Sequence, residues 1–108
     1  MKTTEEEKQF ELIISETLNE LQNLIIKKGK EYRRNNDPYH NFNRGAQFSG
    51  RTPEEVLQGF LLKHLISVDD IRNDLKNGNT PSIELVEEKY NDILVYFLIE
   101  KAMILSKL

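Results

Sequence analysis

Apolar residues recur at helical spacing over three long segments of this 108-residue chain. Side chains three and four positions apart share one face of a helix, so each segment presents an apolar stripe that a neighbour must cover. A chain of this length has room for about one hydrophobic core. The pattern therefore predicts an all-α fold in a single helical domain, residues 1–108, with three long helices plus one short helix in an antiparallel bundle.

Capping residues indicate where these helices begin. Thr4 with Glu7, and Thr52 with Glu55, have the spacing of a capping box, and Pro53 suits the first turn of a helix. Turn-forming residues separate the apolar segments, and Thr80-Pro81 is expected to start the last helix. The expected helices are, in chain order, about Thr4 to about Arg33, Asn41 to Phe48, Pro53 to about Lys76, and about Ser82 to about Lys107.

The last of these helices is apolar on two sides. One face carries Ile83, Val86, Tyr90, Ile93, Leu94, Phe97, Ile104 and Leu105, and the other carries Leu85, Val95, Ile99 and Met103. A helix of this kind is normally buried on both sides, and the other helices of one chain can cover only one side well. We therefore expect a second copy of the chain to cover the second face, giving a homo-oligomer, either a dimer or a dimer of dimers.

Composition excludes several classes of protein. The formal net charge of -3 opposes general nucleic-acid binding, so any phosphate must be held by a local group of cations. The absence of cysteine excludes disulfides and thiolate chemistry, and it fits a reducing cytoplasm. No apolar run approaches the roughly 20 residues of a membrane span. We expect a cytoplasmic protein without a membrane partner.

A set of cationic and hydrogen-bonding side chains is the first candidate site. The set comprises Lys28, His40, Asn41, Arg44, Lys63 and His64, with Tyr32, Tyr39 and Phe42 beside it. Arginine and lysine bind phosphate oxygens, and aromatic rings stack on a base, so the set predicts a site for a phosphate-bearing ligand. Three alternatives remain open: a core histidine at 64 bonded to a carbonyl or an acid, a snorkelling Lys28, and a helix-capping Asn41.

An acidic set is the second candidate. Glu16 and Glu20 lie on the first helix, Glu88 and Asp92 on the last, and each pair is spaced so that both carboxylates project from one helix face. Two such pairs on adjacent helices could hold Mg²⁺, which prefers oxygen ligands. The alternative is that these residues are solvated surface acids.

Four segments resemble a family of small phage and prophage proteins associated with nucleotide modification. They are Lys28-Gly29-Lys30-Glu31-Tyr32, Asp37-Pro38-Tyr39-His40-Asn41-Phe42, Lys63-His64 and Glu88-Lys89-Tyr90-Asn91-Asp92-Ile93. The order and spacing are similar over about residues 24–104. More remotely, the last helix resembles that of all-α nucleoside triphosphate pyrophosphohydrolases of the MazG and dimeric dUTPase type. Those enzymes hold Mg²⁺ with an E-x-x-E pair and an E-x-x-D pair, whereas both pairs here are one residue longer.

Three functions follow from these observations. The resemblance and the cations favour a phage-type nucleotide-binding protein that sequesters a nucleotide or a nucleotide signal, in the cytoplasm of an infected or lysogenic bacterial host. The second is a Mg²⁺-dependent nucleoside triphosphate pyrophosphohydrolase, with Glu20, Glu88 and Asp92 as the metal ligands. The third is a phage protein that inhibits a host protein. Because the longer spacing alters how the carboxylates point, we expect little or no hydrolysis.

Overall fold

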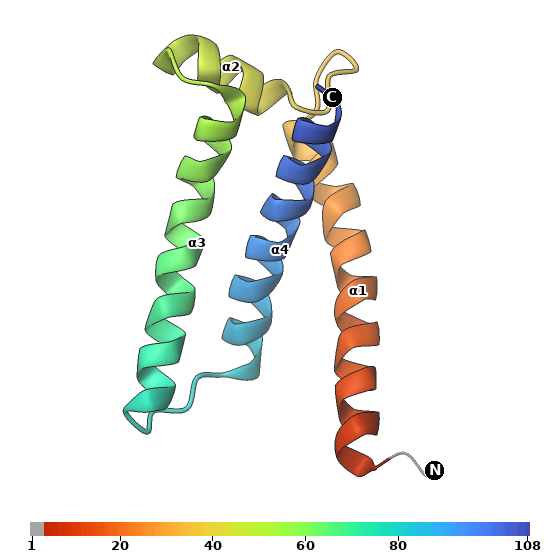
Figure 1. Cartoon of the computed structure of the whole chain (residues 1–108), viewed down its shortest axis with the longest axis vertical. Helices are drawn as coiled ribbons and strands as arrows, with labels where there is room; N and C mark the ends of the chain where they lie inside the picture. Colours follow the sequence, from red (N-terminus) through yellow and green to blue (C-terminus); the bar gives the residue numbers. More distant parts are fainter. Residues whose placement is uncertain (1–3) are drawn as a thin grey trace.

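The computed structural model describes residues 4–108, and over this range the protein consists of four α-helices without a β-strand. They are α1 (Glu5–Tyr32), α2 (His40–Ser49), α3 (Pro53–Lys76) and α4 (Ile83–Leu105) (Figure 1). The all-α prediction of three long helices and one short helix is confirmed. None of the helices in this range has both the length and the apolarity needed to cross a membrane.

The helices begin at local capping interactions. Oγ1 of Thr4 accepts a hydrogen bond from the backbone N–H of Glu7. The capping box of α3 is complete, because the Thr52 and Glu55 side chains each accept a hydrogen bond from the other's backbone. The cap of α4 is Ser82, not the Thr80-Pro81 pair expected from the sequence. These short-range bonds satisfy backbone groups that a helix leaves free at its first turn.

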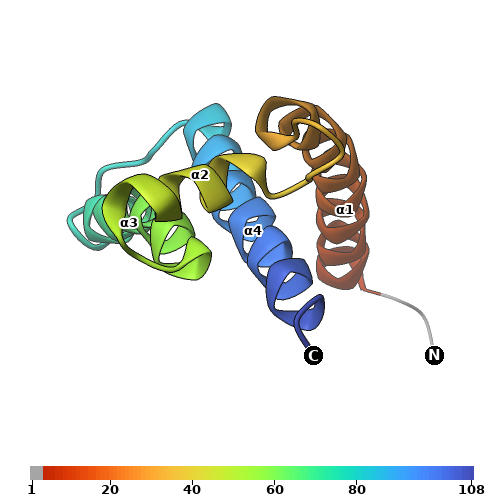
Figure 2. The same cartoon turned by 90° about the horizontal axis from the view of Figure 1, so that it is seen from above.

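The central helix is α4, with α1 on one side and α3 on the other (Figure 1). The α3–α4 hairpin is antiparallel, whereas α1 and α4 run in the same direction, and α2 crosses between α3 and α1 (Figure 2). Within residues 4–108, α1 contacts α4 and α2 but not α3. A single chain therefore forms an open arrangement, and the closed antiparallel bundle is not formed within it.

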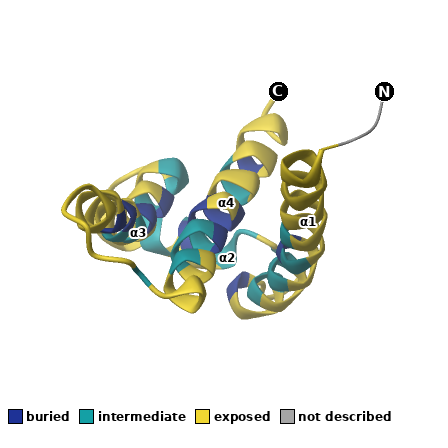
Figure 3. Ribbon diagram, turned by 90° about the horizontal axis from the view of Figure 1, so that it is seen from below, coloured by how far each residue is buried: buried dark blue, intermediate teal, exposed yellow. Residues whose placement is uncertain are grey.

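The hydrophobic core joins all four helices. Its buried side chains are Tyr32, Phe42, Leu57, Leu61, Val68, Ile93, Tyr96 and Met103. Figure 3 shows buried positions along α4 and on α3. Burying an aliphatic or aromatic side chain of this size contributes roughly 1.5–3 kcal/mol. The core is therefore centred on α4, and it fixes the C-terminal end of α1 against that helix and α2 against α3.

The structure differs from the sequence prediction in which apolar faces of α1 and α4 are covered. The first half of α1 stays uncovered, and Phe10 is 65% exposed. On α4, Val95 and Met103 are buried within the chain, so the prediction that their face awaits a partner is wrong. The reason is that α4 is central and has neighbours on both sides. Most of the uncovered apolar residues of α4 belong to the other face, namely Ile83, Leu94, Phe97, Ile104 and Leu105, while Leu85 and Leu98 are exposed besides them.

Candidate functional site

A cluster of aromatic rings lies where the four helices meet. The hydroxyl groups of Tyr32 on α1 and Tyr96 on α4 are 2.9 Å apart and share a buried hydrogen bond. The ring of Phe42 on α2 lies 5.2 Å from that of Tyr32, and the ring of His64 on α3 stacks on Tyr96 at 5.4 Å. Ring pairs at these separations attract one another beyond their buried area. The cluster therefore holds side chains from all four helices in one place.

A cavity of about 310 Å³ opens beside this cluster. It is lined by Tyr32, Gly59, Phe60, Lys63, His64 and Tyr96, and we call it the aromatic cavity. Lys28 does not line the cavity, but its Nζ lies 5.6 Å from the centre of the Tyr96 ring, which does. An ammonium group at this distance is attracted by the ring. The cavity therefore combines aromatic surfaces with one lysine in its lining, Lys63, and a second lysine lies next to one of its lining rings.

His64 has an unsatisfied ring nitrogen at the edge of the aromatic cavity. Its Nδ1 is buried, lies 3.6 Å from Oδ2 of Asp92, and has no hydrogen-bond partner in the part of the chain that the structure describes. A separation of 3.6 Å is too long for a hydrogen bond. The alternative of a histidine satisfied by a carbonyl or an acid is therefore not what the structure contains. A buried polar atom left in this state costs roughly 1–3 kcal/mol, which a ligand or a water could recover.

Tyr32 is neutral at physiological pH. Burial raises the pKa of Tyr32 well above its ordinary value, and the hydrogen bond with Tyr96 raises that pKa further. The neutral hydroxyl is favoured because burial penalises the phenolate. Tyr32 therefore adds no negative charge to the cavity wall.

The acidic residues do not converge within one chain. Glu20 on α1 accepts a hydrogen bond of 2.9 Å from Nδ2 of Asn91, which is 7% exposed, whereas Asp92 faces His64 on α3. Glu88 is exposed and lies 3.9 Å from Lys89, and Glu16 is exposed on α1. Within residues 4–108, no three or more acidic or histidine side chains come close enough to hold a metal ion.

This arrangement does not fit a metal site built by one chain. A divalent cation needs several carboxylate oxygens around one point, whereas Glu20 on α1 is bonded to Asn91 and Asp92 is directed to His64 on α3. Ligation of Mg²⁺ by Glu20, Glu88 and Asp92 stays a prediction from the sequence.

The remaining predicted residues lie on or next to α2. Arg44 is on an exposed face, where its guanidinium carbon lies 4.8 Å from the centre of the Phe48 ring, away from the lining of the aromatic cavity. His40 and Asn41 are the first two residues of α2, so Asn41 follows the cap position instead of occupying it. The structure therefore brings together Lys28, Tyr32, Lys63 and His64 but not Arg44 or Asn41.

Sequence reasoning missed the residue that organises the start of α2. Oδ1 of Asp37 accepts the backbone N–H of Tyr39 at 2.9 Å, and Oδ2 accepts Nδ2 of Asn43 at 2.9 Å. The bond from Asn43, followed by that from Tyr39, lowers the pKa of the Asp37 carboxyl. An aspartate in a turn often accepts a hydrogen bond from the backbone N–H two residues further on, so the sequence could have predicted this role of Asp37.

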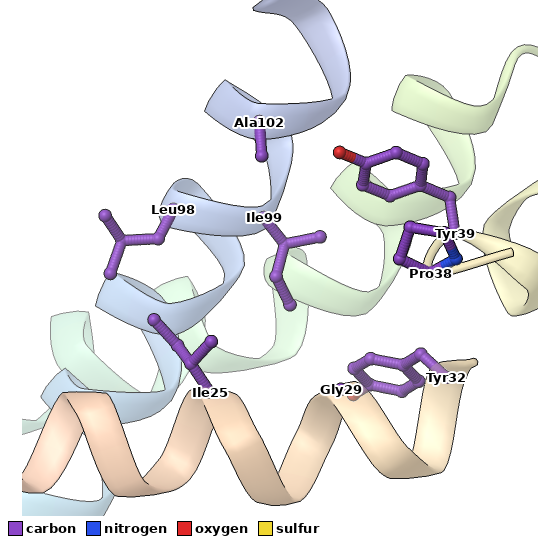
Figure 4. Close-up of a pocket in the computed structure, with 8 residues that line it drawn as sticks. All are labelled: Ile25, Gly29, Tyr32, Pro38, Tyr39, Leu98, Ile99 and Ala102. Carbon is purple, nitrogen blue, oxygen red and sulfur yellow. The ribbon is translucent and has the colours of Figure 1, made fainter. Parts of the chain in front are cut away.

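A second cavity, of about 360 Å³, lies between α1, α4 and the loop before α2 (Figure 4). It is lined by Ile25, Gly29, Tyr32, Pro38, Tyr39, Leu98, Ile99 and Ala102, and we call it the apolar cleft. Tyr39 is the only predicted ligand-binding residue besides Tyr32 in this lining. The apolar spacing of α1 and α4 gives no separate signal for the cleft, because core residues have the same spacing.

Comparisons with known proteins give no match. No protein-family model matches the sequence, and no curated protein or solved structure matches it either. The resemblance to small phage proteins therefore stays a prediction from the segments that carry it.

Proposed function

We propose that this protein binds a nucleotide or a nucleotide signal through the aromatic cavity and sequesters it. The observation that carries the proposal is the combination of Lys63, Lys28 and stacked aromatic rings around one cavity of about 310 Å³. Phosphate is attracted by the ammonium groups, and the neighbouring aromatic rings give the ligand apolar surface to contact. Small-molecule sites have this character, with apolar and aromatic walls and a few convergent polar groups.

Binding without hydrolysis is the form of the proposal that the geometry favours. The aromatic cavity has two lysines at or near its wall, while the carboxylates of Glu20 and Asp92 are directed to separate partners. Hydrolysis assisted by Mg²⁺ would need those carboxylates around one ion. The resemblance supports the same ligand class, and on its basis we propose that the protein acts in the cytoplasm of an infected or lysogenic bacterial host.

The test is calorimetric titration of the full-length protein with nucleoside triphosphates, deoxynucleoside triphosphates and cyclic nucleotides. Lys63→Ala should weaken binding by about tenfold to a hundredfold, because a charge-assisted bond contributes about 1.5–3 kcal/mol. Lys76→Ala, at the far end of the same helix, is the matched control and should leave the affinity unchanged. If no nucleotide binds to the parent protein, the proposal is wrong.

Arg44→Ala separates the sequence prediction from the geometry. The sequence places Arg44 among the ligand contacts, whereas the side chain packs over Phe48 on the exposed face of α2. Unchanged affinity in this variant would remove Arg44 from the site. A loss as large as that of Lys63→Ala would mean that α2 approaches the ligand when it binds.

We also propose that a second copy of the chain covers the uncovered apolar residues of α1 and α4. Phe10, Ile13 and Leu18 on α1 and Phe97 on α4 are each roughly half exposed or more. Exposed apolar surface of this extent is typical of an interface, and symmetric closure is its common form. Light scattering should give a mass above that of one chain, and Phe97→Asp should lower it. A monomer at micromolar concentration would exclude this assembly, and it would favour a host protein as the partner.

A further inference from the structure

At three of the five glycines, the packing or the backbone conformation of the chain explains why the residue is glycine. A Cβ atom added at Gly45 would lie 2.8 Å from Cγ1 of Val56, so close packing of α2 on α3 requires glycine there. Gly50 and Gly78 have φ angles of 69° and 81°, in the left-handed region that other residues avoid. These positions need no ligand to account for them.

The two other glycines lie inside helices and have no such explanation. A Cβ atom added at Gly29 in α1 or at Gly59 in α3 would meet no atom within 4 Å. Glycine in a helix interior costs roughly 0.5–1 kcal/mol relative to alanine. Gly59 lines the aromatic cavity, and Gly29 lines the apolar cleft. The unexplained glycines therefore coincide with the two cavities, where they leave the backbone open to an occupant.

The apolar cleft suits a flat and largely uncharged group. Leu98 and Ile99 of α4 face Ile25 of α1 across it, and the rings of Tyr32 and Tyr39 close one end (Figure 4). Among its lining side chains, the polar atoms are the hydroxyl oxygens of the two tyrosines. A ring system in this space would be held by stacking and by burial of apolar area.

The two cavities share one wall. Tyr32 lines both of them, Lys63 lines the aromatic cavity, and Lys28, the residue before Gly29, has its ammonium group 5.6 Å from the centre of the Tyr96 ring. A ligand with a flat ring at one end and phosphates at the other would thus find an apolar space and cationic groups that both adjoin Tyr32 or its partner Tyr96.

We propose that the apolar cleft is the base subsite of the nucleotide site and that the phosphates lie at Lys28 and Lys63. The proposal rests on the proposed function, since it assigns parts of the same ligand. Because the cleft offers apolar walls and few hydrogen-bonding groups, it selects the base by size. A purine therefore binds more tightly than a pyrimidine, since its second ring buries more apolar area.

The experiment titrates ATP, CTP and inorganic tripolyphosphate into the full-length protein by calorimetry. Gly29→Leu places a side chain in the cleft without backbone strain, since the position is helical and its Cβ direction is open. Gln22→Leu is the matched control, because it adds a leucine to an exposed position of the same helix. A thermal melt shows that each variant folds, and Gly29→Ala is the smaller replacement if Gly29→Leu does not.

The expected result is a loss of ATP affinity by about tenfold or more in Gly29→Leu, with tripolyphosphate binding unchanged. Lys63→Ala should weaken both, and Gln22→Leu should weaken neither. The parent protein should bind ATP more tightly than CTP.

Two results would overturn the proposal while leaving nucleotide binding intact. One is ATP affinity in Gly29→Leu equal to that of the parent. The other is a change of molecular mass in Gly29→Leu but not in Gln22→Leu, which would mean that a second copy fills the cleft. If neither nucleotides nor tripolyphosphate bind to the parent, the proposed function fails and the base subsite fails with it.

Discussion

The hydrogen bond between the Tyr32 and Tyr96 hydroxyls joins α1 to α4 across 64 residues of sequence, and it gives a sharp test of the core. Tyr32→Phe removes one hydroxyl and keeps the ring that packs against Phe42. The loss then has two parts: the net contribution of the bond, about 0.5–1.5 kcal/mol, and the cost of leaving the Tyr96 hydroxyl unpaired. Because Tyr96 lines a cavity that water can enter, we expect the total to stay near 1–1.5 kcal/mol.

This loss is large enough to measure by heating. Unfolding entropy scales with chain length, so a loss of about 1 kcal/mol lowers the melting temperature of a chain of 108 residues by roughly 4 °C. Tyr96→Phe should have a similar effect. The double variant Tyr32→Phe/Tyr96→Phe should be less destabilised than the sum of the single variants, since it leaves no hydroxyl unpaired. Urea unfolding of the four proteins measures this coupling directly.

The pH dependence is an independent check on the same pair. The folded pKa of Tyr32 lies above its unfolded value, so its contribution to stability is complete below about pH 10 and declines as the pH rises further. The difference in stability between parent and Tyr32→Phe should therefore narrow above about pH 10. Additive effects in the double variant, within about 0.3 kcal/mol, would refute the coupling. If the difference in stability between the parent and Tyr32→Phe stays constant with pH, the inference that Tyr32 carries a buried neutral hydroxyl is wrong.

Two further predictions concern single elements. Asp37→Ala should melt at a lower temperature than the parent at pH 7. Its carboxylate, whose pKa the bonds from Asn43 and Tyr39 lower, begins to lose its contribution as the pH falls below its unfolded value. The difference in melting temperature should therefore shrink steadily below about pH 4, and a difference that does not shrink there contradicts this role. Gly45→Ala should lower the stability by about 1–3 kcal/mol through the clash with Val56, whereas Gly59→Ala should raise it by roughly 0.5–1 kcal/mol. Thermal melts of both variants check the second prediction, and a shift of the same sign in both would contradict it.

Helix positions were predictable because their signals are local. The Thr52–Glu55 capping box fixes the start of α3 through bonds that span three residues, and it formed as the sequence indicated. The same holds for Thr4 at the start of α1. The cap of α4 was placed at the Thr80-Pro81 pair because proline is common near helix starts, although Ser82 makes the bond. Errors of this size are usual where several capping residues adjoin.

The covered faces were not predictable, because they depend on which helices become neighbours. Both sides of α4 are apolar, and periodicity describes the two alike. Only the central position of α4 decides that Val95 is fully buried while Phe97 is 48% exposed. Arg44 has the right residue type for a phosphate contact, but it lies on the exposed face of α2, where it packs over Phe48 one turn further along the same helix. The site residues that were found lie on α1 and α3, in the part of each helix that contacts the core.

The acid pair of α4, Glu88 and Asp92, shows which features helix spacing predicts and which depend on helix packing. Glu88 and Asp92 are four residues apart, so the helix alone directs them to the same side. The surroundings of each carboxylate depend on whether a neighbouring helix lies beside that turn of α4. Asp92 lies opposite His64 of α3, whereas Glu88 lies beyond the core and is exposed to solvent. Glu20, which was expected to join them, is bonded to Asn91 instead. Because Asn91 and Asp92 are adjacent on a helix, they point about 100° apart, and their partners on α1 and α3 are kept apart by the same angle. A shared metal ion would need that separation to close, so the carboxylates can meet around one ion only if α1 or α3, from this chain or another copy, is placed differently around α4.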